Sequence, residues 1–230
     1  MEPTETQIRR LARVCRDRLG PPNRWTAPEG YPAGLALCLI DAVQSPGVPP
    51  AVVRKVVARY RAYRRAEGAD PDTDGAVALL GTFHDLGSPQ RWETAIGAPG
   101  RVSSERSAPA KTEVIEAAAA ALSDLEVYSA ADLREIAGYA DGFRSIVHGA
   151  WTALPGQATG VTWRRLLMLA GVDAVWPDRI GVHFVASALD LPPRDVTPEF
   201  AVAALTGAAG VLGVPPGALD RTAGQWRRPR

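Results

Sequence analysis

The chain has 230 residues, a formal net charge of +1 and a hydrophobic content of 46%, which is ample for a sizeable core in one domain or in two. No segment approaches the ~20 apolar residues of a membrane-spanning helix, and the N-terminus has no apolar signal region. We therefore expect a cytoplasmic protein with no membrane partner. Two cysteines, Cys15 and Cys38, lie in apolar helical patterns, which favours buried thiols over a disulfide or a metal site.

Almost every cation in the chain is an arginine, because Lys55 and Lys111 are its only lysines. Schiff-base catalysis needs a lysine or an N-terminal amine at the site, so few candidates for it exist. Three scattered histidines give no metal-binding spacing. Since no cysteine follows Cys38, a C-terminal iron–sulfur cluster is excluded, and we expect no cofactor.

Apolar residues at helical spacing predict a series of helices in the first half of the chain, bounded by prolines, glycines and capping residues. The predicted ranges are residues 4–19, 35–43, 50–65, 76–86 and 89–96. Residues 35–43 are apolar almost all round, which predicts a helix buried in the middle of a helical domain. Residues 20–33 and 97–109 are rich in proline, glycine or polar side chains and predict loops.

The second half continues in the same way. Helices are predicted over residues 109–125, 129–137 and 143–151, then after Leu154, after Asp178, and over residues 197–212 and 215–226. Ser129 and Asp132 form a near capping box at the start of one of them. No segment alternates as a strand does, and no repeat period is present. The sequence predicts an all-α protein with roughly ten or eleven helices.

A basic stripe lies on the third predicted helix. Between residues 54 and 65 there are six cations and no acids, namely Arg54, Lys55, Arg59, Arg61, Arg64 and Arg65. A solvated helix face is the slightly favoured interpretation of this segment alone. A nucleic-acid partner would turn the same stripe into an electrostatic footprint.

A loop at residues 154–161 separates two apolar helices. Pro155 and Gly156 make a tight turn, and Gly160 lies at the start of the next helix. Several backbone N–H groups at such a helix N-terminus suit a phosphate. For a Pro-Gly loop on its own, an ordinary connection whose glycines permit positive φ is the better interpretation.

Asp178 follows Pro177 and precedes an apolar helical run. It is a natural N-cap, and most aspartates in such a position do nothing more. A carboxylate at a helix start can also stabilise a developing positive charge, and the sequence alone leaves both roles open.

Taken together, the loop and the aspartate resemble the helix-hairpin-helix, endonuclease III-like (HhH-GPD) superfamily of DNA glycosylases. That superfamily has a hairpin of the form Leu-Pro-Gly-x-Gly-x-x-Thr-Ala, then a helix, a loop and a catalytic aspartate. Residues 154–160 supply the hairpin, and Asp178 follows Leu154 by 178 − 154 = 24 residues, which matches the superfamily without a gap.

The resemblance covers about residues 31–190 and extends upstream of the hairpin. Residues 35–60 are similar to the first core helix and the turn after it, where a glutamine commonly enters the duplex, and Gln44 occupies that place. Residues 108–111, which end in Lys111, resemble the start of the Lys-bearing middle helix. Two positions depart from the pattern. Ala158 replaces the second hairpin glycine, and Gly160 stands where bifunctional members have the Schiff-base lysine.

The resemblance implies a two-lobed all-α fold. Residues 31–172 would form a core lobe ending in the helix-hairpin-helix, and residues 1–30 plus 173–230 a second lobe that carries Asp178. DNA would bind in the cleft between the lobes. The implied residues are Asp178 for catalysis, Gly156, Ala158, Thr159, Gly160, Gln44, Arg54, Lys55 and Lys111 for DNA binding, and Trp151 with Trp163 for the base pocket. Tryptophan at helical spacing is, however, more often a core residue than a pocket residue.

Because Gly160 cannot attack a sugar, the resemblance implies a monofunctional DNA N-glycosylase, which removes a modified base by base flipping and Asp-assisted hydrolysis. The expected partner is double-stranded DNA, bound by a nucleoid-associated monomer that needs no cofactor, metal or iron–sulfur cluster. One alternative is a non-catalytic DNA-binding protein of the same fold. Another is a helical interaction protein without a nucleic-acid role.

Overall fold

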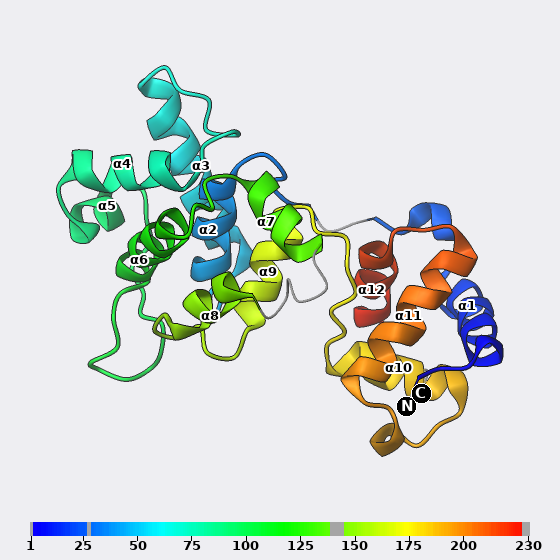
Figure 1. The fold of residues 1–230 in the computed structure, drawn as a ribbon. Coiled ribbons are helices and arrows are strands. Elements are labelled where there is room, and N and C mark those ends of the chain that lie inside the picture. The colour runs from blue at the N-terminus through cyan, green and yellow to red at the C-terminus, as the bar shows by residue number, and fades with distance from the viewer. Residues whose placement is uncertain (1, 27–28, 139–144, 227–230) are drawn as a thin grey trace. The chain divides into compact units, whose positions relative to one another are not determined.

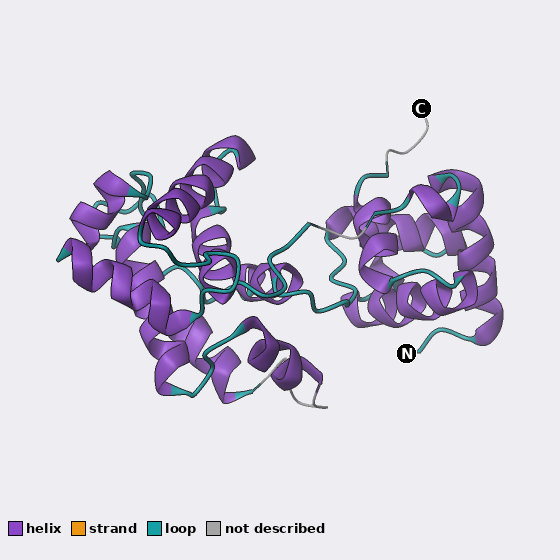
Figure 2. Cartoon of the chain, turned by 90° about the horizontal axis from the view of Figure 1, so that it is seen from above, coloured by secondary structure: helices purple, strands orange, loops and turns teal. Residues whose placement is uncertain are grey.

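The computed structural model describes residues 2–26, 29–138 and 145–226. Within these ranges the chain forms twelve α-helices and two short 3-10 helices, and it contains no strand (Figures 1 and 2). The extended pairing found there is a single bridge between Arg101 and Ala110. The all-α prediction is therefore confirmed for the described part of the chain.

The chain divides into two compact units. Unit 1 comprises Met1–Glu29 and Asp173–Arg230, and unit 2 comprises Gly30–Val172. The α-helices of unit 1 are α1 (Glu5–Leu19), α10 (Arg179–Leu189), α11 (Pro198–Leu212) and α12 (Pro216–Gly224). Those of unit 2 are α2 (Leu35–Gln44), α3 (Pro50–Ala66), α4 (Ala76–Leu86), α5 (Pro89–Ala95), α6 (Lys111–Asp124), α7 (Ala130–Gly138), α8 (Ile146–Ala153) and α9 (Val161–Leu169).

Unit 1 is built around the packing of α1, α10, α11 and α12 on one another. Leu11, Phe184, Leu205 and Leu219 are fully buried in its core. Cys15 lies among them as a free thiol, and burial raises its pKa to about 12. Among the described helices none is long and apolar enough alone to cross a membrane, and α11 and α12 reach that length only as a pair bent by 118°.

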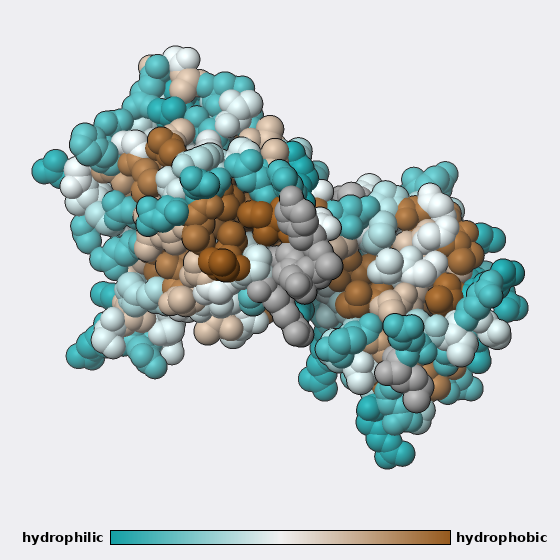
Figure 3. Space-filling view, in the orientation of Figure 1, coloured by the Kyte–Doolittle hydropathy of each residue, from teal (hydrophilic) through white to brown (hydrophobic). Residues whose placement is uncertain are grey.

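Unit 2 is organised around α2, every residue of which is buried. Helices α3, α4, α6 and α9 all pack against it. The sequence prediction of a buried central helix at residues 35–43 is thus confirmed, and its physical reason is that an apolar surface all round a helix needs neighbours on every side. Over both units, the face drawn in Figure 3 carries hydrophilic side chains with hydrophobic ones between them.

A buried carboxylate on α2 fixes α9 to the centre of unit 2. Asp41 is 5% exposed, and its Oδ1 accepts a hydrogen bond from Arg165 Nε of α9 at 2.8 Å. Tyr31 donates its hydroxyl to Asp41 Oδ2 at 3.0 Å, and Ser45 donates to Oδ1 at 3.1 Å. Burial and the neighbouring carboxylate both raise the pKa of Tyr31, so its hydroxyl stays protonated and remains a donor.

Several predicted helix ends are confirmed by their capping bonds. Thr4 and Thr197 accept hydrogen bonds from backbone N–H groups in the first turns of α1 and α11. Asp132 N–H donates to Ser129 Oγ, and the Asp132 carboxylate accepts from Ser129 N–H at 2.8 Å, which completes the predicted capping box. The helix predicted over residues 143–151 is observed as α8 (Ile146–Ala153), and residues 143–144 lie outside the described ranges.

We expect Asp41→Asn to lower the free energy of unfolding by roughly 2–3 kcal/mol, because it leaves the Arg165 guanidinium without its carboxylate while Arg165 itself stays partly solvated. Chemical denaturation monitored by circular dichroism measures the change. The exposed Asp124 provides a matched control, and its change to Asn should alter stability by no more than about 0.5 kcal/mol. Equal stability of the two variants would contradict the role given to Asp41.

Candidate functional site

Helices α8 and α9 are joined by a tight hairpin at residues 154–160. Gly156 has φ +75° and Gly160 has φ +70°, the left-handed region that L side chains rarely adopt. Gly160 is also the N-cap of α9. The two glycines predicted to shape this turn therefore do so, and the sequence expectation of a helix, a Gly/Pro loop and a second helix is met.

The backbone N–H groups of the hairpin fall into two sets. Gln157 N–H donates to Leu154 O at 3.0 Å, and Gly160 N–H donates to Gln157 O at 3.1 Å. The N–H groups of Gly156, Ala158 and Thr159 donate to no atom of the described residues, and all three residues are exposed. The hairpin thus presents three amides to solvent. Gly160 N–H was expected to be among them. This expectation is wrong, because Gly160 N–H is already bonded to Gln157 O within the turn.

The two tryptophans expected in a base pocket lie instead in the core under the hairpin. Trp151 is 1% and Trp163 is 2% exposed, with ring centroids 6.1 Å apart. Trp151 Nε1 donates to Thr162 Oγ1 at 3.1 Å, and the His148 ring packs edge-on against Trp163. The pocket assignment is therefore corrected: indoles at helical spacing on two packed helices fill the space between them.

A second loop, residues 97–110, supports the hairpin. It is closed by the bridge between Arg101 and Ala110, and Val102 N–H donates to Pro109 O at 3.2 Å. Val102 lies against Gly156 so closely that a Cβ on that glycine would come within 2.6 Å of Val102 Cβ. Gly156 is thus required both by its positive φ and by this close approach.

Gln44 and Lys111 are both buried. Gln44 is 1% exposed at the end of α2, and Lys111 is 3% exposed at the start of α6. The Lys111 ammonium donates at 2.8 Å to Gln44 O, the last carbonyl of α2, and at 2.6 Å to Pro46 O in the turn that follows. Burial lowers the pKa of Lys111. Both DNA-contact assignments are therefore corrected, because an apolar helix surrounded by others carries its last side chain into the core.

Most of the basic stripe on α3 is bound within unit 2. Arg61 and Arg65 pair with Asp72, Arg64 pairs with Asp74 and Glu67, and Arg59 donates to Gly97 O at 2.6 Å. Asp74 also accepts a hydrogen bond from the buried Tyr60 hydroxyl. Arg54 and Lys55 are exposed and make no such bond with the described residues. The stripe therefore reduces to two cations that are available to a partner.

Asp178 is exposed and is the N-cap of α10. Its Oδ1 accepts Gly181 N–H at 2.8 Å. A Cβ built on Gly224, at the end of α12, would lie 3.7 Å from Asp178 Oδ2, so the backbone of α12 reaches the carboxylate without covering it. The capping role left open by the sequence is thus observed. Within the described residues no group of His, Cys, Asp or Glu side chains is arranged to hold a metal ion.

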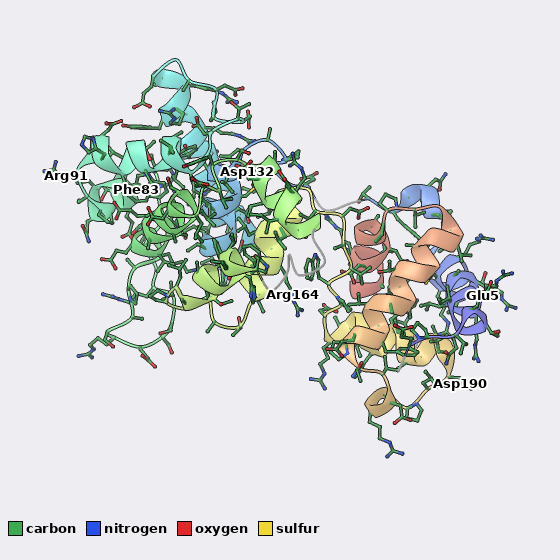
Figure 4. The ribbon with its side chains drawn as sticks, in the orientation of Figure 1. Glu5, Phe83, Arg91, Asp132, Arg164 and Asp190 are labelled. Atoms are coloured by element: carbon green, nitrogen blue, oxygen red, sulfur yellow. The ribbon has the colours of Figure 1, made fainter. Side chains whose placement is uncertain are left out.

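Two further residues of the hairpin helix were missed by sequence reasoning. Val161 is 65% exposed at the first position of α9, directly after the free amides. Arg164, one turn further on, is exposed and labelled in Figure 4. The available signal was helical spacing, because residues 161 and 164 share the face opposite the buried Trp163 and Leu166.

The model of a family described as a domain of unknown function (DUF8548) matches residues 9–228, nearly the whole chain. The chain belongs to this family. No curated protein and no solved structure matches the sequence. Membership of the DUF8548 family therefore assigns no activity to the chain.

We expect Gly156→Ala to lower the free energy of unfolding by roughly 1–3 kcal/mol, since a methyl group must displace Val102 and adopt a positive φ. Gly149→Ala is the matched control on α8. A Cβ there meets nothing within 4 Å, and the helix gains up to about 1 kcal/mol. Thermal unfolding of both variants gives the comparison, and a Gly156→Ala protein as stable as the wild type would contradict the close packing of the two loops.

Proposed function

We propose that the protein is a monofunctional DNA N-glycosylase. The observation that carries the proposal is the exposed carboxylate of Asp178, which stands at a helix N-terminus 24 residues (178 − 154) after Leu154, the first residue of a hairpin that offers three unbonded amides. This is the order and separation of the corresponding parts in the helix-hairpin-helix glycosylases. The two-lobed glycosylase fold is part of the same proposal.

The hairpin would bind the DNA backbone. Exposed N–H groups of Gly156, Ala158 and Thr159 suit the non-bridging oxygens of one phosphate, as amides at helix N-termini do. Such contacts carry no sequence information, which fits an enzyme that must scan duplexes of any sequence.

Asp178 would act on the sugar of a flipped nucleotide. As the bond between C1′ and the base nitrogen breaks, positive charge develops on the sugar, and the carboxylate stabilises it. Water then attacks C1′ and gives up one proton, for which Asp178 is the base, and the proton is delivered to the departing base. The products are the free base and an abasic deoxyribose, so one water is consumed for each base released.

Two observations disfavour catalysis through a lysine imine. Gly160 holds the hairpin position of the Schiff-base lysine with φ +70°, where a lysine would be strained. Lys111 is buried, with its ammonium bonded to two carbonyl oxygens. These observations support simple hydrolysis over strand cleavage through a covalent imine.

The second candidate is a DNA-binding protein of the same fold without base excision. The burial of Gln44, Trp151 and Trp163 favours it, because those side chains were expected to fill the duplex gap and to stack on the flipped base. In this alternative the hairpin binds DNA and Asp178 is only a helix cap.

We expect Asp178→Asn to abolish base release while duplex binding persists, because asparagine keeps the Oδ1 cap on Gly181 N–H but removes the charge. A panel of duplexes, each carrying one modified base, followed by alkaline cleavage at abasic sites measures release. Asp190→Asn at the other end of α10 (Figure 4) is the control and should behave as the wild type.

Two results would contradict the proposed glycosylase activity. One is equal base release by Asp178→Asn, and the other is tight duplex binding by the wild type with no release across the panel, which would favour the DNA-binding alternative. A gel shift without duplex binding would exclude both and leave a helical interaction protein.

We expect the double change Arg54→Gln, Lys55→Gln to reduce the salt dependence of duplex binding by about one unit of slope for each lost phosphate contact. Arg65→Gln is the control, because Arg65 already pairs with Asp72. Binding isotherms at several salt concentrations give the slopes. An unchanged slope in the double variant would remove α3 from the proposed DNA surface.

A further inference from the structure

The segment from Asp173 to Asp178 has no regular secondary structure, yet it is held at both ends by α12. At its start, Asp173 Oδ1 accepts Gly217 N–H in the first turn of α12 at 2.7 Å. Near its end, Asp220 Oδ2 on α12 accepts Trp176 N–H at 2.9 Å. All of these residues belong to unit 1, so the segment is fixed within one compact body.

The connection from Asp220 to Asp178 is short and stiff. Only Pro177 separates Trp176 from Asp178. The proline ring fixes its own φ and restricts Trp176 to extended backbone, so few torsions remain free between the bonded amide and the carboxylate. Val175 on the other side of Trp176 is buried at 4% exposure, which limits movement of the segment as a whole.

The carboxylates of Asp178 and Asp220 both lie close to the backbone of Gly181. A Cβ built on the buried Gly181 would lie 3.7 Å from Asp178 Oδ1 and 3.9 Å from Asp220 Oδ1, and one on Gly224 would lie 3.7 Å from Asp178 Oδ2. Helix α12 therefore holds the amide before Pro177 with one residue and approaches the Asp178 carboxylate with another one turn further on.

We propose that Asp220 is a positioning residue: it fixes the direction of the Asp178 carboxylate through the hydrogen bond to Trp176 N–H. The inference rests on the proposed function, since it gives Asp178 a charge to stabilise. A hydrogen bond to a carboxylate is stronger than one to a neutral acceptor, so Asp220 holds the segment more firmly than an ordinary turn bond does. Without it, Asp178 keeps its cap on Gly181 and Asp173 keeps its bond to Gly217, but the attachment nearest to Asp178 is lost.

The test uses two DNA duplexes that need no knowledge of the modified base. One carries a pyrrolidine abasic-site analogue, which is cationic at neutral pH and resembles the charged sugar, and the other carries the neutral tetrahydrofuran analogue. A correctly placed carboxylate should make the wild-type protein bind the cationic duplex tighter by roughly 10- to 100-fold. The preference, not the affinity itself, reports the placement of Asp178.

Variants of Asp178 and Asp220 distinguish the roles of the two carboxylates in this preference. Asp178→Asn should abolish the preference. Asp220→Ala should reduce it by roughly 3- to 10-fold, as expected for the loss of one hydrogen bond, with tetrahydrofuran binding unchanged. Asp220→Asn keeps an acceptor for Trp176 N–H and should retain most of the preference for the cationic duplex. Asp17→Ala, which removes an exposed carboxylate of α1, is the matched control and should retain all of it.

A wild-type preference that Asp178→Asn loses and Asp220→Ala keeps in full overturns the role of Asp220 and leaves the glycosylase proposal standing. No preference in the wild type overturns both. Amide hydrogen exchange of the wild-type protein adds a measurement that needs no variant: Trp176 N–H should exchange slowly although it lies outside any helix, and fast exchange would overturn the bond.

Discussion

The buried carboxylate of Asp41 is the constraint on which the hairpin depends. Asp41 lies on the central helix of unit 2, and Arg165 of α9 reaches it with a guanidinium that has no comparable partner on its own helix. A charge inside a protein is tolerated only when its lone pairs are satisfied, and Tyr31 and Ser45 complete the set. Because three chain segments converge on one group, α9 has a fixed rotation about its axis. That rotation keeps Trp163 inside and leaves Val161 and Arg164 outside, so the exposed face of the hairpin helix follows from the interaction of Arg165, the middle residue of α9.

Much of the fold follows from local sequence. Proline and glycine punctuation, capping residues and helical spacing were sufficient to predict the helices and the central position of residues 35–43, because these features act within a few residues. The basic stripe shows the limit. Its acidic partners Asp72 and Asp74 lie in the turn directly after α3, close in sequence, yet only the backward bend of that turn brings them against Arg61 and Arg64. Composition shows charges of both signs, but it does not show which of them meet.

The assignments that were wrong share one physical cause. Gln44, Lys111, Trp151 and Trp163 were assigned to DNA through the resemblance to the glycosylases, and each has a long polar or aromatic side chain. All four are buried in unit 2, where the apolar part of each side chain fills volume. The Lys111 ammonium donates to a backbone carbonyl and the Trp151 indole to a hydroxyl, whereas Gln44 Nε2 and Trp163 Nε1 have no hydrogen-bond partner among the described residues. Lys111 is the clearest case, since the last carbonyl of α2, Gln44 O, needs a donor and the Lys111 ammonium supplies one. Sequence reports the type of side chain, but burial is decided by the crossing of elements far apart in the chain.

The two interpretations of Asp178 do not compete. Capping uses Oδ1, which accepts Gly181 N–H, and the carboxylate stays exposed beside Gly224, which has no side chain to cover it. A cap also orients its carboxylate along the helix axis, at the end where the dipole favours negative charge. The bond that makes Asp178 an ordinary N-cap therefore also gives it the fixed direction that a catalytic carboxylate needs. What distinguishes Asp178 from the capping residues Thr4 and Thr197 is the support of the segment before it, which is bound to α12 at two places. Among the described residues, no side chain of another helix is seen to bond the backbone just before Thr4 or Thr197 in this way. A helix cap alone does not require that second attachment, and a carboxylate that must meet a sugar at a defined position does.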